Sequence, residues 1–155
     1  SHVRGNPVID KGLVYAISHS GRLVAIDRRT GARIWERGIG GVETPWIAGN
    51  FLYVLSNESE IYCLTRRGGR IRWVRPLPKF EDPEDKKGLI KWSGPVLVSD
   101  RLVVTGSHGE ALSISPYNGE PLGRVTLPDK ISISPVVAGE TLYFLTDEAE
   151  LIAYR

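Results

Sequence analysis

The side chains that could do chemistry are few in this 155-residue sequence. Its one cysteine, Cys63, would be a nucleophile if its thiolate form were stabilised. The three histidines, His2, His19 and His108, do not have the spacing of metal ligands. His19 and His108 fall in predicted turns, where we expect solvated side chains. These residues alone do not predict a catalytic centre or a metal site.

A cluster of basic side chains offers a second kind of chemistry. Five arginines lie close together: Arg66, Arg67, Arg70, Arg72 and Arg75. Such a cluster can grip a phosphate or a carboxylate. However, Ile71 and Trp73 alternate with two of the arginines, as in a strand with one solvated face. We therefore expect a solvated strand edge that resists aggregation.

The composition is that of a globular protein, with 41% hydrophobic and 25% charged residues. The net charge of +2 is too balanced to indicate a nucleic acid partner. No apolar run has the length of a membrane-spanning helix, about 18 residues or more. The chain opens with Ser1-His2 and contains no methionine, so we expect residues 1–2 to be a tag remnant and the rest to belong to a longer protein.

The elements that position these side chains come from an internal repeat. Its four copies start at Pro7, Pro45, Pro95 and Pro135. A small residue recurs at one offset in every copy: Ala25, Cys63, Ser113 and Ala153. A glycine recurs six positions later in three of them: Gly31, Gly69 and Gly119. Because Cys63 occupies the small-residue position, we expect a buried packing thiol rather than a nucleophile.

Each copy predicts four short antiparallel strands separated by turn signals. Period-two runs rich in Val, Ile and Tyr indicate half-buried strands. In the turn from Asp27 to Gly31, the carboxylate is expected to cap backbone N–H groups, and glycine can take a positive φ. The pattern predicts an all-β fold, a β-propeller fragment of about four blades. We expect the blades at residues 3–40, 41–78, 91–128 and 129–155, the last lacking its fourth strand, with an inserted loop at 79–90.

The docking motif of the repeat resembles that of a known superfamily. The first copy reads Ala25-x-Asp27-x-x-Thr30-Gly31-x-x-x-Trp35, which resembles the tryptophan-docking repeat of quinoprotein (PQQ-like) β-propellers. The second copy keeps Cys63, Gly69 and Trp73, and the third keeps Gly119 but has Gly123 in place of the tryptophan. The resemblance implies that the tryptophan packs between adjacent blades and that the small residue makes room for it.

Within that superfamily, three segments resemble the C-terminal half of a proteobacterial lipoprotein family that belongs to the outer-membrane β-barrel assembly machinery. They are PVIDKGLVYAISHSGRLVAIDRRTG, ETPWIAGN and FEDPEDKKGLIKWSGPVL. The resemblance implies half of an eight-bladed ring, periplasmic and anchored to the outer membrane in the full-length protein. It implies a non-catalytic scaffold without a cofactor, whose protein partner is the barrel-inserting subunit of the complex.

Two other functions stay open. A fragment of a quinoprotein dehydrogenase would let Trp35 and Trp73 stack on a quinone, but such an enzyme also needs a calcium-binding cluster and a catalytic Asp, which we do not find in the sequence. The third function is the sensor propeller of a signalling protein.

The insertion near residues 79–91 is the best candidate for a specific function. It combines four acidic and four basic side chains with apolar ones, and long loops on a rigid scaffold often carry binding. The candidate protein-binding residues are Phe80, Glu81, Asp82, Glu84, Asp85 and Trp92. The alternative is an ordered cover over the blade edges.

A half-ring would expose the apolar faces of its two terminal blades, which favours association. We therefore predict that two chains pair in imitation of an eight-bladed ring. Sedimentation of this chain over a concentration series is expected to reveal a dimer. A monomer at high concentration would contradict the prediction.

Overall fold

The structure is a computed structural model that describes residues 5–127, 136–145 and 151–154. Every regular element in these ranges is a β-strand, and the strands pair in antiparallel sheets. The described part of the chain contains no helix, so the predicted all-β fold class is confirmed. Accordingly, no described helix has the length and apolar character needed to cross a membrane.

The chain divides into two compact units, residues 1–75 and 76–155. The strands of the first unit are β1 (Val8–Asp10), β2 (Leu13–Ser18), β3 (Arg22–Asp27), β4 (Arg33–Arg37), β5 (Trp46–Ala48), β6 (Phe51–Leu55), β7 (Glu60–Thr65) and β8 (Ile71–Pro76), which ends at the boundary. Those of the second unit are β9 (Phe80–Asp82), β10 (Lys87–Leu89), β11 (Trp92–Val98), β12 (Arg101–Gly106), β13 (Glu110–Ile114), β14 (Pro121–Thr126), β15 (Val136–Ala138), β16 (Thr141–Leu145) and β17 (Leu151–Tyr154).

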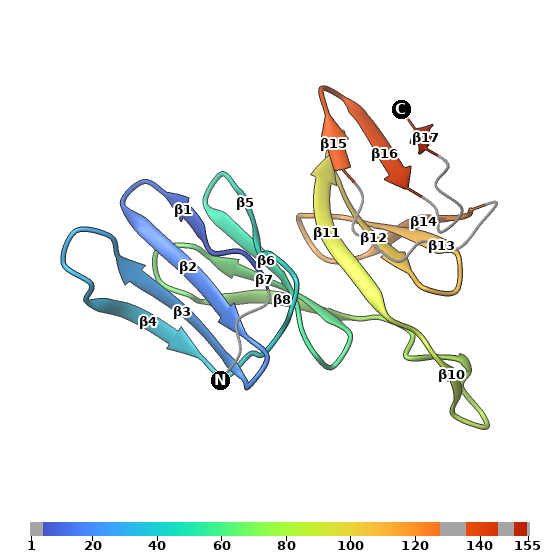
Figure 1. Cartoon of the computed structure of the whole chain (residues 1–155), viewed down its shortest axis with the longest axis horizontal. Coiled ribbons are helices and arrows are strands. Elements are labelled where there is room, and N and C mark those ends of the chain that lie inside the picture. Colours follow the sequence, from blue (N-terminus) through green and yellow to red (C-terminus); the bar gives the residue numbers. More distant parts are fainter. Residues whose placement is uncertain (1–4, 128–135, 146–150, 155) are drawn as a thin grey trace. The chain divides into compact units, whose positions relative to one another are not determined.

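The strands form sheets in simple chain order (Figure 1). The first unit holds the four-stranded sheets β1–β4 and β5–β8. The second holds the four-stranded sheet β11–β14, the three-stranded sheet β15–β17 and the two-stranded sheet β9–β10. Four antiparallel strands in sequential order are the arrangement of a propeller blade. The insertion that was predicted as a loop thus forms a β-hairpin of its own.

The turn between β3 and β4 shows how one blade closes on itself. Oδ1 of Asp27 accepts hydrogen bonds from the backbone N–H groups of Arg29 (2.8 Å) and Thr30 (2.9 Å). These bonds, that of Thr30 above all, lower the pKa of the Asp27 carboxyl. Gly31 closes the turn with a φ of 75° and a 2.8 Å bond from its N–H to the carbonyl oxygen of Asp27. The equivalent glycines of the next two blades are Gly69 and Gly119, with φ values of 65° and 76°.

A row of cross-strand neighbours crosses the first blade. It consists of Val8, Tyr15, Ala25 and Trp35, one residue from each strand. Ala25 lies between the two aromatic residues and projects only a methyl group. The ring centroids of Tyr15 and Trp35 therefore lie 6.1 Å apart across it, within the range of favourable aromatic pairs.

The later blades repeat this row with different side chains. In the second blade Tyr53 and Trp73 also have ring centroids 6.1 Å apart, and Cys63 is the cross-strand neighbour of Tyr53. In the third blade the row consists of Val96, Val103, Ser113 and Gly123 and contains no aromatic ring. The small residue is thus common to all three rows, whereas the aromatic pair is not.

Trp35 joins the first two blades by packing on the turn between β7 and β8. Its Nε1–H donates a 3.0 Å hydrogen bond to the carbonyl oxygen of Arg66, and the hydroxyl of Tyr15 donates to the same oxygen, also at 3.0 Å. The backbone of Gly69 lies against the indole so closely that a β-carbon there would stand 2.5 Å from Cδ2 of Trp35. Only glycine permits this approach.

Arg37 holds the same turn from the end of β4. Its Nε donates to the carbonyl oxygen of Gly69 at 2.7 Å, and its Nη2 donates to that of Gly68 at 3.0 Å. The guanidinium carbon also lies 5.6 Å from the ring centroid of Trp35, a cation–π distance. The turn is therefore held by packing, by hydrogen bonds and by a cation–π contact together.

Comparing two glycine substitutions isolates the Trp35 contact. Gly69→Ala and Gly31→Ala both place a side chain at a positive φ, but the β-carbon at Gly31 would have no atom within 4 Å. Both substitutions carry the backbone strain of about 1–2 kcal/mol, and only Gly69→Ala must also displace the indole, at a further cost of about 1–3 kcal/mol. Urea unfolding should therefore show Gly69→Ala to be the less stable variant. Equal losses of unfolding free energy would contradict the packing described for Trp35.

Candidate protein-binding hairpin

Arg66 does not belong to a solvated strand edge, contrary to the expectation for the arginine cluster. Its side chain is 2% exposed. Its Nε donates to the carbonyl oxygen of Gly49 at 3.0 Å, and its Nη1 lies 3.4 Å from Oδ2 of Asp10. Because a buried guanidinium is costly unless it is paired, these two partners make the burial tolerable. The strand alternation that predicted exposure does not extend to Arg66, which lies in the turn after β7. Three others, Arg67, Arg70 and Arg72, are exposed.

Cys63 lies buried in β7 with 2% of its surface exposed. Burial raises the pKa of its thiol to about 11, although a hydrogen bond with Tyr53 acts in the opposite direction. A nucleophilic cysteine needs a pKa shifted the other way, because the thiolate is the reactive form. The environment of Cys63 is therefore that of a packing residue.

The two described histidines have different surroundings, and His2 lies outside the described residues. His19 is exposed, with Nδ1 3.2 Å from Oδ1 of Asn57. The expectation of a solvated turn side chain is wrong for His108, whose side chain is 14% exposed. Its Nε2 lies 3.2 Å from Oε2 of Glu110, and its ring meets Trp92 edge-on with centroids 5.4 Å apart. Among the described residues no three His, Cys, Asp or Glu side chains form a group suited to a metal ion.

The hairpin β9–β10 has a buried base. Leu77, Ile90 and Trp92 lie at its two ends and are each at most 6% exposed. The N–H of Ile90 donates to the carbonyl oxygen of Lys79 at 2.8 Å, and Nε1 of Trp92 donates to that of Pro78 at 2.8 Å. Trp92 therefore anchors the hairpin and offers little surface to a partner, although it was among the predicted binding residues.

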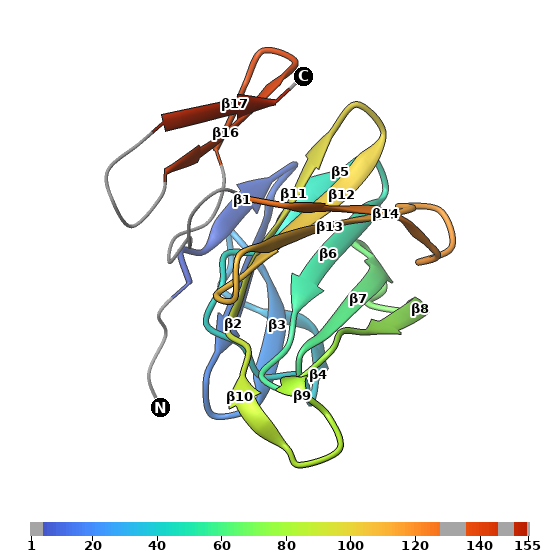
Figure 2. The ribbon, with the colours of Figure 1, turned by 90° about the vertical axis from the view of Figure 1, so that its right-hand side faces the viewer.

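The tip of the hairpin is solvent-exposed. Phe80 pairs with Leu89 and Asp82 with Lys87 across the two strands. All residues from 81 to 89 are exposed, and Leu89 retains 74% of its accessible surface. The hairpin extends away from the β11–β14 sheet in both views (Figures 1 and 2). Within the second unit, the hairpin is therefore a projecting surface and not a cover on the β11–β14 sheet.

The predicted binding residues thus fall into two groups. The four acidic ones, Glu81, Asp82, Glu84 and Asp85, lie at the exposed tip, where Oδ1 of Asp82 caps the turn by accepting from the N–H of Asp85 at 3.2 Å. Phe80 is half-buried, and it lies between the tip and the base. Leu89 and Lys87 were not among the candidate binding residues, and they lie opposite two of them.

The raised pKa of Cys63 has a measurable consequence. We expect the folded protein to react with a neutral disulfide reagent at pH 8 at least about 100-fold more slowly than the same chain in denaturant, because the thiol is both protonated and buried. Absorbance of the released thiolate follows the reaction. A rate in the folded state equal to that of the unfolded chain would contradict the packing assignment.

Comparisons with known proteins give a consistent result. The family model described as outer membrane protein assembly factor BamB matches residues 1–75. BamB of Alkalilimnicola ehrlichii is 27% identical over 99% of this chain and 38% of its own length. BamB of Escherichia coli is 32% identical over 70% of this chain and 26% of its own length. The chain therefore spans less than two fifths of these curated relatives.

Solved structures show the same fold. The crystal structure of BamB from Moraxella catarrhalis matches 97% of this chain and 44% of that chain, with a TM-score of 0.82 and 17% identity. Quinohemoprotein alcohol dehydrogenase from Comamonas testosteroni matches 81% of this chain and 21% of that chain, with a TM-score of 0.65 and 20% identity. At these identities the likeness concerns the fold alone. The chain is thus similar to BamB in sequence along nearly its whole length, and it has the fold of the BamB propeller.

Proposed function

We propose that this chain is part of a non-catalytic scaffold in outer-membrane β-barrel assembly. The observation that carries the proposal is the match, along nearly the whole chain, to relatives named as outer membrane protein assembly factors. By that name the relatives are assembly factors rather than enzymes. In the full-length protein we place the propeller in the periplasm, anchored to the outer membrane, with the barrel-inserting subunit as its partner.

Within this scaffold we propose the β9–β10 hairpin as a protein-binding element. Its exposed tip offers carboxylates, ammonium groups and the apolar side chain of Leu89 on one narrow surface. Among the described strands, β9 and β10 pair only with each other, so each has an edge with backbone groups available for a further strand. Strand addition to such an edge is a common mode of peptide recognition.

The buried base supports this role. Because Leu77, Ile90 and Trp92 hold the two ends of the hairpin, the tip is presented without a large entropic cost of ordering on binding. The surrounding sheets provide the rigid support on which binding loops are usually carried.

Excising the tip tests the hairpin without disturbing the blade. Because Phe80 and Leu89 are cross-strand partners, replacing residues 81–88 by Asn-Gly leaves them joined by a two-residue turn. In the full-length protein we expect the affinity for the barrel-inserting subunit to fall at least about tenfold, as for the loss of a binding hot spot. The melting temperature should stay within a few degrees, because every removed residue is exposed.

A matched control replaces surface charge elsewhere. The double variant Arg28→Gln and Arg29→Gln alters an exposed turn of the first blade and should leave the affinity unchanged. If tip excision lowers stability but not affinity, the hairpin is a structural element and the binding proposal fails. If neither the wild-type protein nor the variants bind the subunit, the proposed function itself fails.

A further inference from the structure

One face of the β11–β14 sheet lacks the rings that fill the matching face of β1–β4. Where the first blade has Tyr15 and Trp35, the third has Val103 and Gly123, with Ser113 between them. A β-carbon added at Gly123 would have no atom within 4 Å. The third blade therefore leaves open the space that two aromatic rings occupy in the first.

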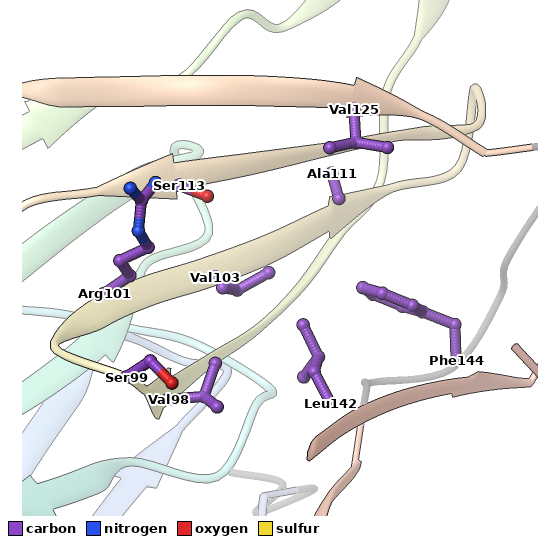
Figure 3. Close-up of a pocket in the computed structure, with 9 residues that line it drawn as sticks. All are labelled: Val98, Ser99, Arg101, Val103, Ala111, Ser113, Val125, Leu142 and Phe144. Carbon is purple, nitrogen blue, oxygen red and sulfur yellow. The ribbon is translucent and has the colours of Figure 1, made fainter. Parts of the chain in front are cut away.

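A cavity of about 300 Å³ lies on this face, entirely within the second unit. Leu142 and Phe144 of β16 close it from the neighbouring sheet, and they are 6% and 2% exposed (Figure 3). Val103, Ala111 and Ser113 form its wall on the β12–β13 side. The volume is at the lower end of the range for small-molecule sites, about 300–1,000 Å³, and suits a molecule of one or two rings.

The cavity has a polar end and an apolar end. Arg101, Ser99 and Ser113 lie toward one side together with Val98, and Leu142 and Phe144 lie toward the other (Figure 3). The side chain of Arg101 makes no ion pair with any residue that the structure describes.

The nearest acidic residue in the sequence is already engaged. The hydroxyl of Tyr117 donates its one proton to the Asp100 carboxylate, whose Oδ1 and Oδ2 lie 2.7 and 2.8 Å from it. Because Arg101 has no carboxylate partner among the described residues, its guanidinium can pair with an anionic ligand.

We propose that this cavity binds a small aromatic anion, with its ring in the apolar end and its carboxylate or sulfonate near the guanidinium of Arg101. In the first unit the corresponding space holds the indole of Trp35 with Arg37 over it, which supports a ring at this position. The charge of Arg101 and the hydroxyls of Ser99 and Ser113 favour an anionic group. A guanidinium pairs well with a planar carboxylate.

The probe is 2-naphthoate, titrated into this chain and followed by the methyl NMR signals of Val103 and Leu142. We expect shifts that saturate at both methyl groups. Its uncharged analogue 2-naphthol should bind at least about tenfold more weakly, because it lacks the charge-assisted contact. Shifts that do not saturate, or equal affinity for the two compounds, would overturn the proposal.

Substitutions locate the site. Arg101→Gln should weaken 2-naphthoate at least about tenfold, whereas Arg124→Gln, on the opposite face of the same sheet, should not. Two separate variants, Gly123→Trp and Val103→Tyr, each place in the third blade a ring that the first blade has at that position. Each should abolish the binding of 2-naphthoate. At Gly123 an added β-carbon would have no atom within 4 Å, so we expect Gly123→Trp to fold even if Val103→Tyr destabilises the sheet, and thermal unfolding of each variant checks this. Wild-type affinity in a folded, ring-restored variant would refute the assigned site.

Discussion

The packing of one indole on one glycine is the constraint on which the first unit depends. Trp35 reaches Gly69 of the next blade only because Ala25 leaves room beside Tyr15 and because Gly69 has no side chain. The hydrogen bonds from Tyr15 and Trp35 to the Arg66 carbonyl then fix the turn that carries Gly69. The small residue, the tryptophan and the glycine of the repeat are thus three requirements of a single contact between sheets.

What the sequence could predict is what each blade determines by itself. The strands, the Asp27 turn and the small-residue position follow from local patterning, and all are present in the structure. The burial of Arg66 could not be predicted in this way. Its partners are Asp10 of β1 in the first blade and Gly49 in the β5–β6 turn of the second blade, and no spacing along the chain relates them. The burial of His108 likewise depends on Trp92, which follows the hairpin insertion.

The same constraint gives a physical explanation of the third blade. Once tyrosine and tryptophan are replaced by Val103 and Gly123, the neighbouring sheet has no ring to pack against, and the small Ser113 cannot fill the space. In the first two blades the small residue lies between two aromatic rings. In the third blade the same small residue has no ring beside it, and the volume stays open. Residues that keep a structural repeat are explained by folding. Residues that depart from it are therefore informative about other roles.

The hairpin departs from the repeat in the opposite sense, by adding residues rather than losing them. An added loop of this length would ordinarily carry a large conformational entropy into any complex. Here the pairing of Phe80 with Leu89, the Asp82 cap and the buried Trp92 fix the backbone before a partner arrives. An ordered but uncovered hairpin contributes little to the blade's own core. Its exposed edges and mixed charges are consistent with the role in recognition that we propose for it.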